Sequence, residues 1–233
     1  MTTNNGDPLV IAEGLTRIYS MGATQVTGIK DIAFKINDGE LVVLKGNSGS
    51  GKSTLLALLA GLDQPTRGRL IVAQQDLQKA SQNDLIRYRQ EVVGVIFQSF
   101  NLLPTLSVLE NVCLPALLAG RKFSEVRTKA MELIEWLNLT PRHNHRPAQL
   151  SGGEMQRTAI ARSLINDPKI ILADEPTGNL DSRNGQIVIE LLSELNRNAS
   201  RTVIFATHST LADPYATTQI CLRDGTITET CEV

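Results

Sequence analysis

The sequence predicts an α/β fold: a mostly parallel core sheet, an N-terminal antiparallel β subdomain and an inserted α-helical subdomain. Three observations support this prediction. The apolar run 41–44 is followed by a glycine-rich loop and then by an apolar helix pattern over 55–62. Strand and helix patterns alternate here and again after residue 168, as is typical of parallel sheets. Between these two parts, residues 106–165 have a mostly helical pattern, which indicates a separate helical unit.

The first elements are expected to be strands. The segments 9–19 and 26–36 have strand-like patterns, in the second of which Ile32, Phe34 and Ile36 alternate with polar neighbours, and the loop 19–22 lies between them. The segment Asn37-Asp38-Gly39 predicts a hairpin-type turn into the strand before the glycine-rich loop. After the first helix, a further strand is expected near residues 69–73.

A short helix and a buried strand precede the helical block. Ser81 is a candidate cap for a helix that runs to about Gln90. The apolar run 92–97 predicts a buried strand that ends at Gln98. Within the block, apolar side chains recur at the spacing of one helix face. They are Val126, Ala130, Leu133, Ile134 and Leu137.

The last elements return to the core. Strands are expected over 169–173 and 202–207, with a helix near 186–196 between them. Asp224-Gly225 predicts a final hairpin turn.

Composition limits the classes of function. The chain has 233 residues and a net charge of −1, so no general basic field favours nucleic acid. No apolar run reaches the ~18 residues of a spanning helix, and the polar segment Met1–Pro8 lacks the apolar core of a signal peptide. We therefore expect a soluble or peripheral protein that needs another chain for any work in a membrane.

The cysteines are odd in number and share no C-x-x-C spacing. They are Cys113, Cys221 and Cys231. This pattern predicts neither a disulfide framework nor a zinc site, and it favours a reducing compartment.

The glycine-rich loop matches the phosphate-binding pattern G-x-x-x-x-G-K-[ST]. Its members are Gly46, Asn47, Ser48, Gly49, Ser50, Gly51, Lys52, Ser53 and Thr54. Glycines let backbone N–H groups approach an anion, and the following helix directs its positive dipole end to the same point. Lys52 would contact the β- and γ-phosphates of a nucleotide, and the Ser53 hydroxyl would ligate Mg²⁺. A glycine-rich turn without a ligand is the alternative, which the strand–loop–helix context disfavours.

Two carboxylates follow the apolar run 170–173. Ligands bind at the carboxyl edge of open parallel sheets, so Asp174 is expected to hold Mg²⁺ and Glu175 to polarise the attacking water. A solvated turn is the alternative for any Asp-Glu pair at a strand end.

The segment Ser151-Gly152-Gly153-Glu154 forms a second candidate site. Ser-x-x-Glu is a capping box, and a helix through Ile165 follows it. The two glycines are poor helix formers, so they indicate close approach of another group to a helix N-terminus with a free hydroxyl, which is an anion site. A simple capped helix is the alternative. The chain thus has two phosphate-binding edges, and one nucleotide between two copies would use both.

Two other strand ends carry polar side chains. His208 follows the strand 202–207 and is expected to contact the γ-phosphate, with a structural role as the alternative. Gln98 lies on the same edge and could ligate Mg²⁺ or water. His143 and His145 form an H-x-H pair, for which a solvated loop is favoured over a metal site.

Together these motifs resemble the nucleotide-binding subunit of ATP-binding-cassette transporters over nearly the whole chain. The motifs that carry the resemblance are 46–54, Gln98, the Leu-Ser-Gly-Gly signature in 150–157, 170–175, 179–181 and His208. The signature is highly specific for this family. Residues 97–104 and 173–182 look most like the lipoprotein-release and macrolide-export branch.

The resemblance implies one cassette domain over 1–233. A phosphate-loop NTPase (RecA-like) core with its β subdomain would comprise 1–97 and 166–233, and the helical signature subdomain 98–165. It also implies that two copies sandwich two ATP, with Mg²⁺, head to tail. Ser151 and Gly153 of one copy would touch the γ-phosphate bound by Lys52 of the other, and Asp181 would link the two sites.

The resemblance further assigns roles around the nucleotide. Tyr19 would stack on adenine, Glu175 would be the general base, and His208 and Gln98 would sense the γ-phosphate. The groove near Gln98 and the helical block would receive a coupling helix from an integral membrane permease.

The function implied is that of an ATPase subunit of an export or extraction machine, attached through its permease to the cytoplasmic face of the inner membrane. One alternative is a soluble cassette ATPase acting on DNA or ribosomes, but such proteins usually carry two cassettes or a long coiled coil. Another is a small-molecule kinase or GTPase, in which the signature has no role. We expect no nucleic-acid partner. Departures from the family pattern at Asn47, Met155 and Ser209 remove no catalytic group.

Overall fold

Two sheets form the framework of the computed structural model, which describes residues 8–22 and 24–231. The larger sheet has the strand order β10-β9-β3-β8-β7-β6. Its strands are β3 (Leu41–Lys45), β6 (Val93–Ile96), β7 (Ile170–Asp174), β8 (Thr202–Ala206), β9 (Thr218–Arg223) and β10 (Thr226–Thr228). All neighbours pair in parallel except the β9–β10 hairpin. The predicted mostly parallel core sheet is confirmed.

The smaller sheet is antiparallel, as predicted, with the order β2-β1-β4-β5. Its strands are β1 (Val10–Met21), β2 (Thr24–Ile36), β4 (Arg67–Val72) and β5 (Gln75–Asp76). Two local predictions for this region are wrong. Tyr19 lies within β1, opposite Val26, rather than in a loop. The turn at 37–39 exists, but it leads from one sheet to the other, because β3 is buried along its length and pairs with β8 and β9 instead of β2.

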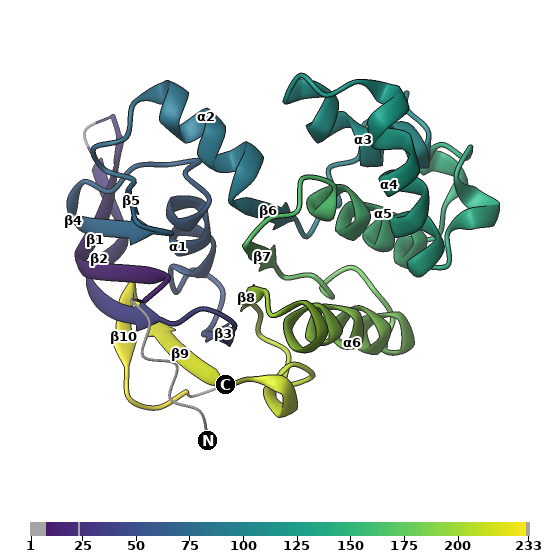
Figure 1. Cartoon of the computed structure of the whole chain (residues 1–233). Helices are drawn as coiled ribbons and strands as arrows, with labels where there is room; N and C mark the ends of the chain where they lie inside the picture. Colours follow the sequence, from purple (N-terminus) through teal and green to yellow (C-terminus); the bar gives the residue numbers. More distant parts are fainter. Residues whose placement is uncertain (1–7, 23, 232–233) are drawn as a thin grey trace.

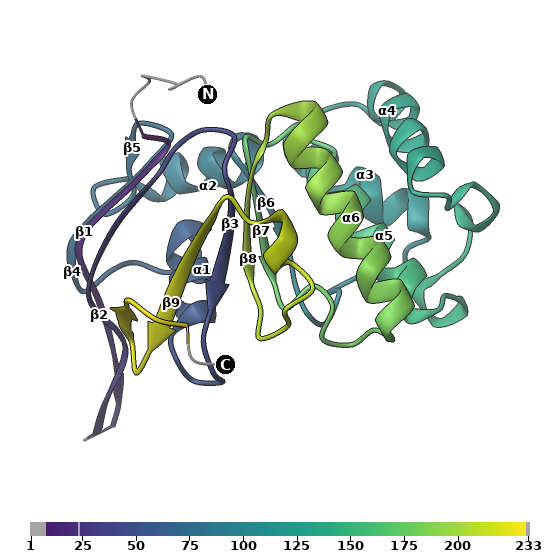
Figure 2. The same ribbon diagram turned by 90° about the horizontal axis from the view of Figure 1, so that it is seen from below.

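Helices cover both faces of the parallel sheet. The first helix, α1 (Lys52–Leu59), lies between the two sheets, and α2 (Gln82–Glu91) follows β5. The predicted Ser81 cap of α2 is confirmed as a full capping box with Asp84. In both Figure 1 and Figure 2, α3 (Val108–Leu118), α4 (Phe123–Trp136) and α5 (Gly152–Leu164) gather on the side away from the antiparallel sheet. The last helix, α6 (Ser182–Ala199), is longer than expected.

The parallel sheet separates two hydrophobic cores. Along β3, Val42 and Leu44 belong to the core with α1 and the antiparallel sheet, whereas Leu41 and Val43 belong to the core with α3 to α6. This alternation follows from the two-residue period of a strand. A strand buried on both faces reads as a continuous apolar run, which is why the sequence reveals it clearly.

The expectation that the cysteines form no disulfide is wrong. Cys221 on β9 and Cys231 form a disulfide, with Cα atoms 5.0 Å apart. The hairpin turn at Asp224 and Gly225, where both residues have positive φ, returns the chain so that Thr228 lies opposite Cys221. A separation of ten residues has no sequence signature, so spacing alone did not reveal this pair. Cys113 is free, and burial raises the pKa of its thiol to about 11.

Among the described residues, no helix combines the length and apolar character needed to cross a bilayer. Residues 1–7, part of the segment in which no signal peptide was expected, lie outside the described residues. The subdomain boundaries 1–97, 98–165 and 166–233 stay a prediction.

Candidate functional site

The loop between β3 and α1 can be built only with glycine at two positions. Gly46 has φ 146° and Gly51 has φ 105°, values that side chains of L residues rarely adopt. A Cβ on Gly46 would lie 2.2 Å from the Leu222 carbonyl oxygen, and one on Gly51 would lie 2.6 Å from the Gly28 carbonyl oxygen. The loop is therefore seated directly against the backbones of β9 and β2.

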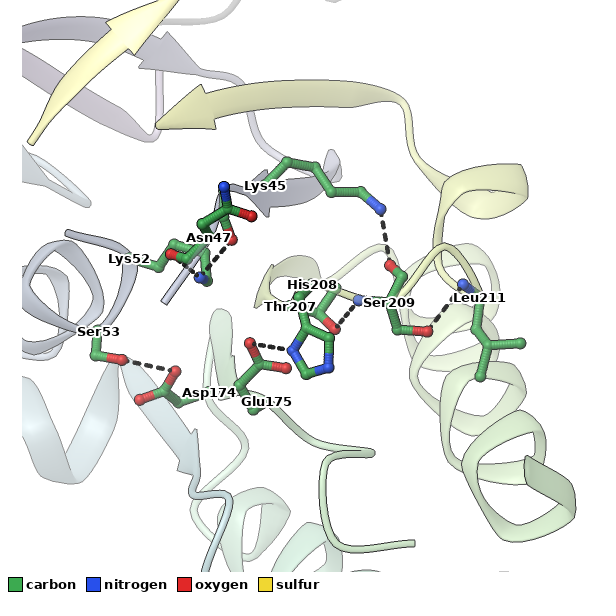
Figure 3. Close-up of polar contacts among 11 residues, drawn as sticks. Lys45, Asn47, Lys52, Ser53, Asp174, Glu175, Thr207, His208, Ser209 and Leu211 are labelled. Atoms are coloured by element: carbon green, nitrogen blue, oxygen red, sulfur yellow. Dashed lines mark hydrogen bonds and ion pairs between the residues drawn. The ribbon is translucent and has the colours of Figure 1, made fainter. Parts of the chain in front are cut away.

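The side chain of Lys52 folds over this loop. Its Nζ donates to the carbonyl oxygens of Gly46, at 2.7 Å, and Asn47, at 3.1 Å (Figure 3). The residue is only 6% exposed. An ammonium group has three N–H donors, so one donor remains for an anion that approaches the loop.

A hydroxyl and a carboxylate meet beside the loop. Ser53 Oγ donates to Asp174 Oδ1 at 3.1 Å, across the space between α1 and the end of β7 (Figure 3). Burial raises the pKa of Asp174, helped by the charge of Glu175 and opposed by Ser53 and Lys52. A hard divalent cation prefers oxygen ligands of this kind and would offset the buried charge, so the two residues fit Mg²⁺.

Glu175 holds one oxygen toward His208 and leaves the other unsatisfied. His208 Nδ1 lies 3.0 Å from Glu175 Oε1 (Figure 3), whereas Oε2 is buried and has no hydrogen-bond partner. Glu175 also has φ 44°, a strained conformation of the kind that concentrates at functional sites. The Glu175 side chain is 14% exposed, so a rotation of the carboxylate would bring this unpaired oxygen to a water molecule in the cavity.

One open cavity of about 720 Å³ connects most of the predicted residues. Its lining includes Tyr19, Gln98, Glu175, His208 and most of the loop 47–54. Gln98 is exposed, and its backbone carbonyl accepts from Asn179. Gly46 and Ser50 line a different cavity of about 360 Å³, on the side of the disulfide. His143 lies elsewhere, with Nδ1 2.8 Å from the Thr140 carbonyl, and the described residues contain no group of three or more possible metal ligands.

Tyr19 borders the cavity and is held by two residues that the sequence reasoning missed. Its hydroxyl donates to Asp63 at 3.0 Å, and the Arg17 guanidinium lies 4.5 Å from the ring centroid. Arg17 also pairs with Asp63 at 2.8 Å. The two-residue spacing of Arg17 and Tyr19 on a strand was an available signal. A fixed aromatic ring at a cavity edge fits a flat base.

The second predicted edge has a different local structure from the one expected. The Ser151 hydroxyl is not free, because it donates to Glu154 Oε2 at 3.0 Å and accepts from the Glu154 N–H. The hydrogen bond from the Ser151 backbone N–H, with support from Arg142, lowers the pKa of Glu154. The predicted capping box of α5 is confirmed, and the interpretation of a free hydroxyl is wrong.

The close approach indicated by the two glycines is found at one of them. A Cβ on Gly153 would lie 2.4 Å from Asn184 Oδ1, whereas Gly152 has ordinary spacing. Asn184 donates from its backbone and side chain to Asp181, which caps α6. Asp181 and the start of α5 are thus connected through Asn184.

The second edge does not join the first within one chain. Ser151, Gly152, Gly153, Glu154 and Asp181 are absent from the lining of the cavity at the glycine-rich loop. Figure 1 shows α5 in the helical group, with the parallel sheet between it and α1.

Comparisons with known proteins give one consistent family. The family profile described as ABC transporter matches residues 29–178. Two dimeric structures of MJ0796, described as a bacterial ABC transporter cassette and, in one case, bound to ADP and Pi, are 38% identical, with a TM-score of 0.88 over 94% of this chain and 97% of theirs. The structure of cbiO1 from Clostridium perfringens, part of the ABC transporter complex cbiONQ, is 26% identical, with a TM-score of 0.84 over 96% of this chain and 88% of its own.

The half-buried charge of Asp174 should cost stability in the absence of a cation. Because the folded-state pKa is raised, this carboxyl destabilises the fold increasingly as pH rises from its unfolded-state pKa through the folded one. We expect Asp174→Asn to raise the Tm of the nucleotide-free, metal-free protein at pH 7. Melting curves by circular dichroism measure this.

The control is Asp84→Asn in the capping box of α2, where hydrogen bonds from Ser81 lower the pKa of the carboxyl. That variant should lower the Tm at pH 7. A Tm of Asp174→Asn at or below that of the unmodified protein would contradict the proposed cost of burial.

Proposed function

The chain belongs to the ABC transporter family and is an ATPase cassette, and from that premise we propose that two copies close head to tail on ATP to drive a separate membrane subunit. The observation that carries this proposal is the division of the site within one chain. The cavity at the loop 46–54 contains the lysine and the candidate base, whereas the signature edge at Ser151 lies outside it. A second copy could supply the missing edge.

ATP would occupy the cavity with its phosphates at the loop. Backbone N–H groups of the loop, the start of α1 and the remaining N–H donor of Lys52 would bind the phosphate oxygens. The Tyr19 ring would stack on adenine. Ser53, Asp174 and Gln98 would hold Mg²⁺, which would supply positive charge against the phosphates when bound.

Hydrolysis would use the free oxygen of Glu175. That oxygen, Oε2, would accept a proton from the attacking water as the water oxygen bonds to the γ-phosphorus and the bond to the bridging oxygen of ADP breaks. His208 would orient Glu175 through Oε1 and contact the γ-phosphate. The products are ADP and inorganic phosphate.

The signature edge would complete the site from the other copy. The Ser151 hydroxyl has one O–H donor, which forms a hydrogen bond to Glu154 in the single chain. It could instead form that hydrogen bond to a γ-phosphate oxygen bound by the partner copy, since a hydroxyl rotates easily. The connection from Gly153 through Asn184 to Asp181 supports the prediction that Asp181 links the two sites.

A surface at the ends of α2 and α3 supports docking of the membrane subunit. Gln90 Nε2 donates to the Leu118 carbonyl, so these two helix ends meet. Ile86, one turn before Gln90, is 44% exposed and Leu118 is 72% exposed. We propose that a coupling helix of an integral permease covers this surface and the region of Gln98. The cassette would then lie on the cytoplasmic face of the inner membrane and serve export or extraction, including lipoprotein release or macrolide export.

The role of Glu175 can be tested by Glu175→Gln, which keeps the shape and removes the basic oxygen. We expect ATP affinity to be retained and the hydrolysis rate to fall by about 10²-fold or more. The variant should also accumulate as a dimer with ATP in size-exclusion chromatography, because closure is no longer followed by hydrolysis. Glu132→Gln, at an exposed position of α4, is the control and should behave as the unmodified protein. Unmodified turnover by Glu175→Gln would refute the proposed role.

The signature edge can be tested by Ser151→Arg. The long side chain should block closure on the partner's phosphate, so hydrolysis should be lost while binding of a fluorescent ATP analogue at Lys52 is retained. Ser200→Arg, just after α6, is the control, because Ser200 lies outside both phosphate-binding edges. Full hydrolysis by Ser151→Arg would show that the second edge is not used.

A further inference from the structure

A lysine directly before the phosphate-binding loop is buried. Lys45 ends β3, after four apolar residues, and is only 2% exposed. The alternation of β3 directs its side chain to the same face as Leu41 and Val43, which is the face covered by α6 and the segment after β8. Burying an unpaired ammonium group costs several kcal/mol, so its partners define what the residue does.

Both partners of Lys45 lie in the segment that follows β8. Its Nζ donates to the Ser209 carbonyl oxygen at 2.7 Å (Figure 3) and lies 2.6 Å from Asp213 Oδ1. That carboxylate oxygen is buried and accepts no hydrogen bond of good geometry, so the ammonium charge is what compensates it. Lys45 therefore connects the end of β3 to Ser209, the residue directly after His208.

The segment has further anchors at the end of β8 and in the hydrophobic core, where Ala212 is buried. Thr207 donates its N–H to the Leu44 carbonyl oxygen at 3.1 Å, and the Ser209 N–H donates to Thr207 Oγ1 at 3.0 Å. The His208 side chain itself is 69% exposed. The direction of that side chain therefore depends on the backbone on either side of it, and Lys45 holds one of those sides.

We propose that Lys45 is a positioning residue that fixes His208 relative to the phosphate-binding loop. This proposal rests on the proposed contact of His208 with the γ-phosphate. Three contacts connect the loop lysine to the candidate base. Lys52 donates to the Gly46 carbonyl, and Lys45, the residue before Gly46, donates to the Ser209 carbonyl. His208, the residue before Ser209, contacts Glu175. Lys45 does not line the cavity at the loop and acts only through these neighbours.

The test is Lys45→Met, which keeps the buried apolar stem and removes the ammonium group. The Ser209 carbonyl then loses its donor, and Asp213, whose side chain is 33% exposed, can turn to water. Because small displacements of reacting groups cost up to about 10²-fold in rate, we expect kcat for ATP to fall about tenfold. KM should change by less than about twofold, because the phosphate and base contacts are retained.

The matched control is Arg201→Met at the opposite edge of the same sheet. Arg201 donates to the Pro168 carbonyl and pairs with Asp167, so it combines the same groups: one cation, one backbone carbonyl and one aspartate. Arg201→Met should lower the Tm, as Lys45→Met does. Unlike Lys45→Met, it should leave both kcat and KM unchanged. If both variants lower kcat in proportion to their loss of Tm, Lys45 has only a structural role and the proposal is wrong.

Combination with His208→Ala separates the proposal from its premise. In that background, Lys45→Met should have no further effect on the residual rate, measured by long time courses of phosphate release. Full turnover by His208→Ala alone would remove the proposed role of His208. A slow His208→Ala variant that Lys45→Met slows a further tenfold would overturn the role of Lys45 and leave that of His208 intact.

A readout that needs no turnover completes the test. The imidazole signals of His208, identified in NMR spectra by their loss in His208→Ala, should shift or broaden in nucleotide-free Lys45→Met and not in Arg201→Met. Unchanged His208 signals in Lys45→Met would contradict the proposal.

Discussion

The structure depends on one geometric constraint: parallel strands end at the same edge of their sheet. The carboxyl ends of β3, β7 and β8 lead directly to the phosphate-binding loop, to Asp174 and Glu175, and to His208. Residues more than 150 positions apart therefore meet without a long-range signal in the sequence. Two hydrophobic cores, one on each face of the sheet, hold that edge in place. The cost of the arrangement appears locally, in the half-buried Asp174, whose pKa is raised by burial, and in the strained backbone of Glu175.

Much of the fold and site follows from the sequence, since the signals involved are local. The loop 46–54, the two carboxylates at the end of β7 and the capping boxes at Ser81 and Ser151 depend on residues a few positions apart. What the sequence did not reveal has no recognisable spacing. The Cys221–Cys231 disulfide and the contacts of Lys45 with Ser209 and Asp213 are of this kind.

The two predicted phosphate-binding edges differ in what they leave unpaired within one chain. At the first, Glu175 Oε2 is buried without a partner, and one donor of Lys52 remains for an anion. At the second, the Ser151 hydroxyl satisfies itself on Glu154. We propose that ATP contacts both edges at once when two copies meet, with its phosphate replacing Glu154 as the acceptor for the Ser151 hydroxyl, so that nucleotide binding and dimer closure are one event.

The most direct test mixes two inactive variants, Ser151→Arg and Lys52→Ala. In a head-to-tail pair of one copy of each, one site combines the intact Lys52 of the first with the intact Ser151 of the second, and the other site has both defects. We expect the mixture to hydrolyse ATP at a substantial fraction of the unmodified rate, although each variant alone is inactive. A mixture no more active than the sum of its separate components would contradict the claim that each reaction centre is shared between two copies.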